Sequence, residues 1–207
     1  MTETELAFDL QLVTRHFEMA MIGDRDVCLI NCVVFWLFPQ LGKIFIFVER
    51  DVTDKTSTLQ SFQGQEPYQT VESMLRHEST AGTSKSLRPV SGTVTLLRLH
   101  RALLFVIELI RTIRDSRDSD KLAGGAKRAY ESTLAKFHPW PVQKAVRLAV
   151  HTLPNRPVLF QKIFGNQVGE IEMNEAEQIM TTHIETAETV YTRMQELYKE
   201  YDLLDIP

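Results

Sequence analysis

The chain has 207 residues, of which 43% are hydrophobic and 24% are charged, and its formal net charge is −4 at pH 7. This composition excludes disordered, collagen-like and coiled-coil proteins, and we expect a single domain over residues 1–207 with a sizeable core. The slightly acidic balance argues against a partner as strongly anionic as nucleic acid, since nucleic-acid-binding domains are usually basic.

The N-terminal part of the chain is predicted to begin with a helix. Apolar residues recur every three or four positions from Glu5 to Met21, as they do on one face of a helix. This terminus has no basic start and no early apolar run, so we expect no secretory signal.

Cys28 and Cys32 are the only cysteines. Two are too few for a disulfide framework, and free thiols favour a cytoplasmic location.

A largely apolar stretch from Val27 to Val48 raises the question of a membrane span. A spanning helix needs about 20 mostly apolar residues. This stretch is interrupted by Asn31, by Pro39 and Gln40, and by Gly42 and Lys43. A buried helix, or two buried half-helices, is therefore favoured over a spanning helix.

Helical periodicity continues through the rest of the chain. The segment from Thr93 to Arg114 is too apolar for an ordinary surface helix, so we expect it at the centre of the fold. The other predicted helices cover residues 44–59, 68–77, 121–137, 141–153 and 174–201, and the segment 158–164 is short and apolar. A loop rich in Ser, Thr, Gly and Pro is expected at 79–91. Because no alternating strand pattern of useful length occurs, the sequence predicts an all-α protein.

Motifs of common enzymes do not occur in the sequence. There is no P-loop, no dinucleotide-binding glycine motif, no serine-hydrolase motif and no HExxH. The six histidines are scattered along the chain, so no metal site is predicted and no cofactor is expected. A hydrolase that used Asp51 and His138 would also need a nucleophile, and no nucleophile motif accompanies them. We therefore expect a protein that is not an enzyme.

A small set of polar residues lies on the predicted apolar helices. Asp51 and Lys55 are spaced i, i+4 on one helix face, a spacing that also fits a plain surface ion pair. Arg98 and Arg101 lie in the most apolar helix, where a charge must be paired or must face a cavity. His138 precedes a proline, a place typical of a capping or core histidine.

These residues fall within five sequence blocks that together resemble the glycolipid transfer protein family, and most closely its phosphate-selective branch. The blocks are KIFIFVERDV at 43–52 with Lys55, LRLHRAL at 97–103, FHPW at 137–140, TLPNR at 152–156 and the ending LLDIP at 203–207. Each block alone is a weak signal. Their order and spacing along most of the chain argue against chance similarity.

The resemblance implies an all-α, two-layer sandwich of about eight helices that takes one sphingolipid. The hydrocarbon chains would enter an apolar pocket between the layers, and the head group would stay in a polar surface site. The resemblance also implies that Asp51 binds the amide nitrogen of ceramide and that His138 donates to the amide carbonyl oxygen. One donor and one acceptor of the lipid would then be satisfied.

The resemblance further implies that Lys55 and Arg98 bind a phosphate head group, because an ammonium and a guanidinium suit a phosphate better than a sugar. Arg98 matches one of two arginines that hold the phosphate in that branch, and Val94 occupies the position of the other. We therefore expect help from another base, such as Arg101 or Arg88, or else weaker or altered head-group binding.

Membrane contact is implied around Trp140, which lies between two prolines beside the head-group residues. Lys144 and Arg147 follow on about the same helix face, and an aromatic ring with a small basic patch favours transient docking. The resemblance thus implies a cytoplasmic, monomeric carrier that moves a sphingolipid, with ceramide-1-phosphate as first choice, between membranes. The alternatives are a sphingolipid sensor or interaction protein with weak transfer, and a glycosphingolipid carrier.

Overall fold

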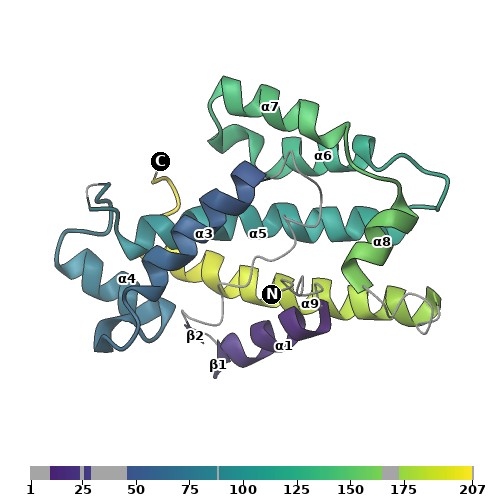
Figure 1. Ribbon diagram of the computed structural model, residues 1–207. Helices are drawn as coiled ribbons and strands as arrows, with labels where there is room; N and C mark the ends of the chain where they lie inside the picture. Colours follow the sequence, from purple (N-terminus) through teal and green to yellow (C-terminus); the bar gives the residue numbers. More distant parts are fainter. Residues whose placement is uncertain (1–9, 24–25, 29–45, 88, 165–172, 207) are drawn as a thin grey trace, which may run out of the picture.

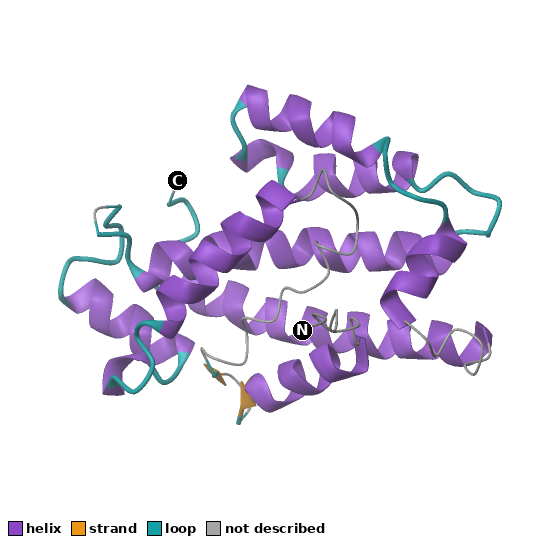
Figure 2. Cartoon of the chain, viewed as in Figure 1, coloured by secondary structure: helices purple, strands orange, loops and turns teal. Residues whose placement is uncertain are grey.

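The computed structural model describes residues 10–23, 26–28, 46–87, 89–164 and 173–206. Eight α-helices lie in these residues: α1 (Leu10–Ala20), α3 (Ile46–Gln60), α4 (Val71–Thr80), α5 (Gly92–Asp115), α6 (Ala123–Thr133), α7 (Trp140–Val150), α8 (Arg156–Phe164) and α9 (Met173–Glu200). Two 3-10 turns, η2 (Glu66–Tyr68) and η3 (Ala135–Phe137), and an antiparallel pair of short strands, β1 (Met21–Ile22) and β2 (Asp26–Val27), complete the described structure. Helix dominates (Figure 2), which confirms the all-α class.

Helix α5 lies at the centre of the molecule, as its apolar sequence predicts. Fifteen of its 24 residues are buried. It packs against α9 along one side and against α6 along the other, and α3 crosses it in a second layer (Figure 1). Helix α1 packs in turn against α9. The two-layer helical sandwich implied by the resemblance is therefore confirmed.

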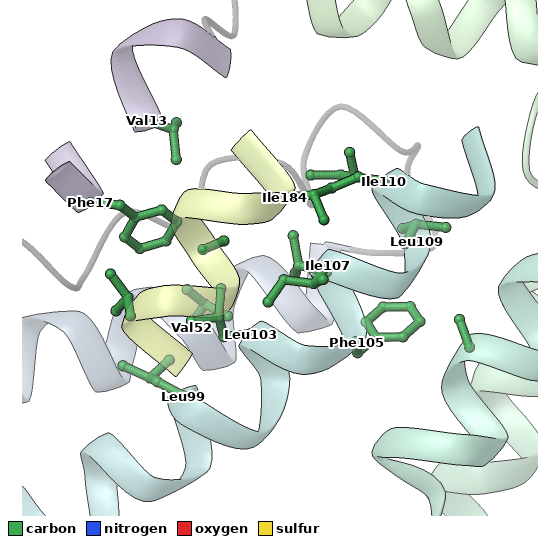
Figure 3. Close-up of a cluster of buried hydrophobic side chains, with 14 of the residues drawn as sticks. Val13, Phe17, Val52, Leu99, Leu103, Phe105, Ile107, Leu109, Ile110 and Ile184 are labelled. Atoms are coloured by element: carbon green, nitrogen blue, oxygen red, sulfur yellow. The ribbon is translucent and has the colours of Figure 1, made fainter. Parts of the chain in front are cut away.

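The core that joins these helices is formed by aliphatic and aromatic side chains. Figure 3 shows Val13 and Phe17 of α1, Val52 of α3 and Ile184 of α9 around the side chains of α5. All of them are buried, and each side chain of this kind contributes about 1.5–3 kcal/mol when it leaves water. The burial of Val52 fixes the rotation of α3, and with it the direction of the preceding residue, Asp51.

A buried carboxylate fixes the N-terminus of α5. The two oxygens of Glu78, on α4, accept hydrogen bonds from the backbone N–H groups of Gly92 at 2.8 Å and Thr93 at 2.9 Å. These N–H groups have no partner within the helix, and a negative charge there also suits the helix dipole. A Cβ at position 92 would lie 2.6 Å from the sulfur of Met74, so any larger residue would displace that buried side chain. This junction fixes the start of α5, the helix that carries Arg98.

The corner between α6 and α7 differs from the sequence prediction. The prediction of one continuous helix over 121–137 is wrong at its end, because α6 stops at Thr133 and the turn η3 follows. His138 is extended, with φ −102° and ψ 138°. A residue before a proline disfavours helical backbone, so Pro139 explains why the chain turns extended at His138.

Two of the predicted segments near the N-terminus are only partly described. Residues 5–9 of the first predicted helix lie outside the described residues, as do residues 29–45 of the apolar stretch, for which a buried helix was predicted. Among the helices that the structure describes, none has both the length and the apolar character needed to cross a bilayer. The strand pair β1–β2 was not predicted, because two-residue strands are too short to show alternation.

Candidate functional site

Asp51 and Lys55 form an ion pair across one turn of α3. The Nζ atom of Lys55 donates to Oδ1 of Asp51 and lies 3.4 Å from the backbone oxygen of the same residue. The side chain of Asp51 is 64% exposed, whereas that of Lys55 is 16% exposed. A pair of this kind contributes about 0.3–0.5 kcal/mol. A ligand that binds both groups can therefore displace it at little cost.

His138 faces this pair from the junction between η3 and α7. Burial holds the pKa of His138 below its ordinary value, while Asp51 raises that pKa and Lys55 lowers it. Such electrostatic effects weaken with distance. The structure thus brings an imidazole, a carboxylate and an ammonium from distant parts of the sequence into one site.

The backbone and the ring of His138 are both held in place. The hydroxyl of Tyr130, a buried residue of α6, lies 2.9 Å from Nδ1 of His138. The side-chain amide of Gln143 donates to the carbonyl oxygens of Ala135 and His138, both at 2.9 Å. Sequence reasoning missed Tyr130 and Gln143. Tyr130 reaches His138 only because the helix ends between them, and the proline at 139 was the one available signal of that break.

Arg98 and Arg101 form a second group of charges on α5. Burial and the nearby charge of Arg98 both lower the pKa of Arg101, which places the two guanidinium groups within electrostatic range of each other. The guanidinium carbon of Arg101 lies 4.0 Å from the ring centroid of Phe137, the residue before His138. Arg101 and Phe137 therefore connect the α5 cations to the His138 side of the site.

Arg101 also holds the C-terminal segment. Its Nη2 atom donates to the backbone oxygens of Leu204 at 2.8 Å and Ile206 at 2.6 Å. A phosphate contact from Arg101 would thus have to use its other N–H groups, and the predicted contact stays a prediction. Sequence reasoning missed this role, although the ending LLDIP was one of the blocks that carried the resemblance.

Two further positions, Val94 and Arg88, were considered for the predicted phosphate site. Val94 is completely buried on α5, so it offers neither a charge nor an exposed surface to a head group. Arg88 lies outside the described residues, and its assistance remains a prediction.

An exposed aromatic residue stands next to the polar site, at the start of α7. Trp140 is 67% exposed, and Nζ of Lys144 lies 5.3 Å from its ring centroid. One turn beyond Lys144, Leu148 is 61% exposed, so three residues at i, i+4 and i+8 share one face of α7. Phe137, just before this helix, is also exposed. Leu148 and Phe137 were missed because each is a single apolar residue in a pattern that fits core packing.

The surface around this corner is basic, although the chain as a whole is acidic. Residues 121–150 contain six Lys or Arg residues and one Glu, in a chain whose net charge is −4. All six basic residues are exposed. Arg147 is partly neutralised, because its Nε atom lies 3.2 Å from the Glu131 carboxylate. In the part of the chain that the structure describes, no three His, Cys, Asp or Glu side chains gather as metal ligands would.

Comparisons with known proteins agree on one family. The family model described as glycolipid transfer protein matches residues 31–165. A ceramide-1-phosphate transfer protein from Xenopus laevis is 33% identical, and the alignment covers 100% of both chains. Among solved structures, the apo form of the mouse ceramide-1-phosphate transfer protein has a TM-score of 0.87 at 29% identity, covering 97% of this chain and 100% of that chain. The human protein in complex with 2:0 ceramide-1-phosphate has a TM-score of 0.85, with the same identity and coverage.

Proposed function

This chain belongs to the glycolipid transfer protein family, and from that membership we propose that it is a non-enzymatic carrier of a sphingolipid, with ceramide-1-phosphate as the lipid that fits best. The observation that carries the proposal is the meeting of Asp51, Lys55 and His138 on one surface. A similar human protein in complex with 2:0 ceramide-1-phosphate supports the choice of lipid.

The amide of the lipid is bound by a matched donor and acceptor. The exposed carboxylate of Asp51 accepts the amide N–H, and the imidazole of His138 donates to the amide carbonyl. A polar group that loses water without finding a partner costs about 1–3 kcal/mol. The two side chains remove that cost for an amide, and they do so for any lipid with the ceramide linkage.

The head group is selected by positive charge. When the amide takes Asp51, Lys55 is released from its ion pair and turns to the phosphate, with Arg98 on α5 as the second cation. Hydrogen bonds to charged groups contribute about 1.5–3 kcal/mol each. A neutral sugar would leave both cations without an anion, which disfavours the wrong ligand. Burial of the hydrocarbon chains, at about 25 cal/mol per Å², supplies affinity but little choice of head group.

Docking at the membrane is assigned to the α7 corner. Trp140, Lys144 and Leu148 share one exposed face, and Arg147 lies beside them. An indole settles at the membrane–water interface, and a basic residue near an anionic leaflet contributes about 1 kcal/mol. The protein would thus work from the cytosol as a monomer, touching a bilayer only while lipid is loaded or released.

The proposal is tested by removing the carboxylate at the site. Asp51→Val should lower the transfer of ceramide-1-phosphate between vesicles by at least about tenfold, because one charge-assisted hydrogen bond is lost. Its helical circular dichroism should stay unchanged. Asp54→Val is the matched control, since Asp54 is an exposed carboxylate on the same helix, and it should transfer normally. Undiminished transfer by Asp51→Val, or an equal loss in both variants, would contradict the proposed site.

A further inference from the structure

The hydroxyl of Tyr130 has one acceptor in the described structure, and that acceptor belongs to the site. Tyr130 is almost fully buried, its ring packs edge-on against Phe105 with centroids 6.2 Å apart, and its oxygen lies 2.9 Å from Nδ1 of His138. A buried O–H without an acceptor costs about 1–3 kcal/mol. The hydroxyl therefore donates to Nδ1, and the imidazole proton is on Nε2.

We propose that Tyr130 is a positioning residue of the lipid site: it fixes His138 as the neutral Nε2–H tautomer and aims that N–H at the carbonyl oxygen of the lipid amide. The inference rests on the proposed function, because it takes His138 to bind the amide. The direct ligands stay Asp51 and His138, and Tyr130 acts through the ring of His138.

The backbone of His138 is held by other residues, so Tyr130 acts only on the orientation of the imidazole ring. Gln143 holds the carbonyl of His138 at 2.9 Å and that of Ala135 at the same distance. The backbone N–H of His138 donates to the Ala135 oxygen at 3.2 Å. With the main chain fixed in this way, rotation of the imidazole is the remaining freedom, and the Tyr130 hydroxyl removes it.

The charges around His138 make this restraint useful. Asp51 and Lys55 face the ring from α3 with opposite effects on its pKa, and Tyr130 faces it from α6. Burial raises the pKa of Tyr130, while Arg147 of α7 lowers it. A protonated His138 would pair with Asp51 and take the carboxylate that the lipid N–H needs. A hydroxyl that donates to the unprotonated nitrogen disfavours the imidazolium, so Tyr130 keeps Asp51 available.

The test compares two tyrosine-to-phenylalanine variants of the full chain. Tyr130→Phe keeps the ring and removes the hydroxyl. Tyr198→Phe is the matched control, because Tyr198 is equally buried and its hydroxyl donates to the backbone oxygen of Thr93 at 2.8 Å. Nitrogen-15 spectra of the lipid-free protein report the tautomer and the pKa of the imidazole, which is assigned by its absence from His138→Ala. Vesicle transfer of ceramide-1-phosphate reports function.

We expect Tyr130→Phe to give a mixture of His138 tautomers and a His138 pKa closer to the ordinary value. Transfer should fall by about 3- to 10-fold, because one hydrogen bond is lost. Tyr198→Phe should lower the melting temperature as much as Tyr130→Phe does, yet it should keep the wild-type imidazole signals and the wild-type rate of transfer. In the His138→Ala background, Tyr130→Phe should cost no further transfer.

The possible failures can be told apart. Wild-type imidazole signals in Tyr130→Phe, an equal loss of transfer in Tyr198→Phe, or a further loss in the His138→Ala background would each overturn the role of Tyr130. If His138→Ala by itself transfers ceramide-1-phosphate at the wild-type rate, the amide clamp of the proposed function is wrong, and the role of Tyr130 is overturned with it.

Discussion

In the proposed function, the choice of head group depends on Lys55. Its side chain is largely shielded from water and its ammonium is already paired with Asp51, so the charge is held close to the place where the lipid amide would bind. A compact cation of this kind suits a phosphate. Among the described cations, Lys55 is the one paired with Asp51, and it acts on the pKa of His138.

Replacing this ammonium with a neutral amide should narrow the preference for phosphate. Lys55→Asn is expected to lower ceramide-1-phosphate transfer by about tenfold or more, since a charge-assisted contact is lost, while galactosylceramide transfer changes less. Parallel vesicle assays with the two lipids give the ratio. Lys199→Asn, at an exposed lysine on α9, should leave that ratio as in the wild type. An unchanged ratio in Lys55→Asn would remove Lys55 from the head-group site.

At the level of single residues, the sequence predicted some contacts and missed others for clear reasons. The i, i+4 spacing of Asp51 and Lys55 predicted a shared helix face, and the structure forms their ion pair. The contacts of Arg101 with the C-terminal segment join residues about a hundred positions apart, and no periodicity reports such contacts. The burial of Val94 could not be predicted either, because a valine in an apolar helix fits either face.

At the level of elements, helix α5 was predicted well because its apolar pattern is long. The end of α6 was not, because the local periodicity continues past Thr133 to the extended residue His138. That break turns His138 toward α3 and starts α7 at Trp140. The corner that the sequence did not predict therefore sets the position of His138 relative to the exposed face of α7.

The close packing of α6 on α5 requires a glycine at one position. A Cβ at Gly125 would lie 2.2 Å from Cγ2 of Thr112, whose hydroxyl is held by the Glu108 backbone oxygen at 2.9 Å. Gly125→Ala should therefore destabilise the protein by about 1–3 kcal/mol. The neighbouring Gly124 meets only Arg128, at an ordinary 3.7 Å, so Gly124→Ala should stabilise by about 0.5–1 kcal/mol. Denaturant unfolding of both variants is the measurement, and equal effects of the same sign would contradict this packing.

The docking face of α7 should act on membrane binding without acting on stability. Trp140 is exposed and makes no large contribution to the core, so Trp140→Ala should weaken vesicle binding and slow transfer with little change in melting temperature. Leu148→Ala should do the same to a smaller degree, because less apolar surface is removed. Sedimentation with anionic vesicles and thermal melts test both variants. A fall of many degrees in the melting temperature of Trp140→Ala would show that this residue packs in the core.

At the level of the whole molecule, the arrangement of charge matches the proposed work. The acidic chain carries a basic surface over residues 121–150, beside the site and on the helices that include the exposed Trp140 and Leu148. An anionic bilayer would therefore attract this corner and orient the molecule with the head-group site toward the lipid.

Periodicity in the sequence predicted the helices and the all-α class. It could not show which helices pack together, because an apolar helix face does not specify which other face it contacts.

The central claim, that this protein selects a phosphate-headed sphingolipid, is tested most directly by native mass spectrometry of the wild-type protein. The protein is incubated with vesicles that contain equal amounts of ceramide-1-phosphate and galactosylceramide, then separated from them. The account predicts a complex with one lipid in which the mass of ceramide-1-phosphate predominates, because Lys55 and Arg98 supply the charges that a phosphate needs. A complex that carries mainly galactosylceramide would contradict the assignment of the head group, although the fold and the family would stand.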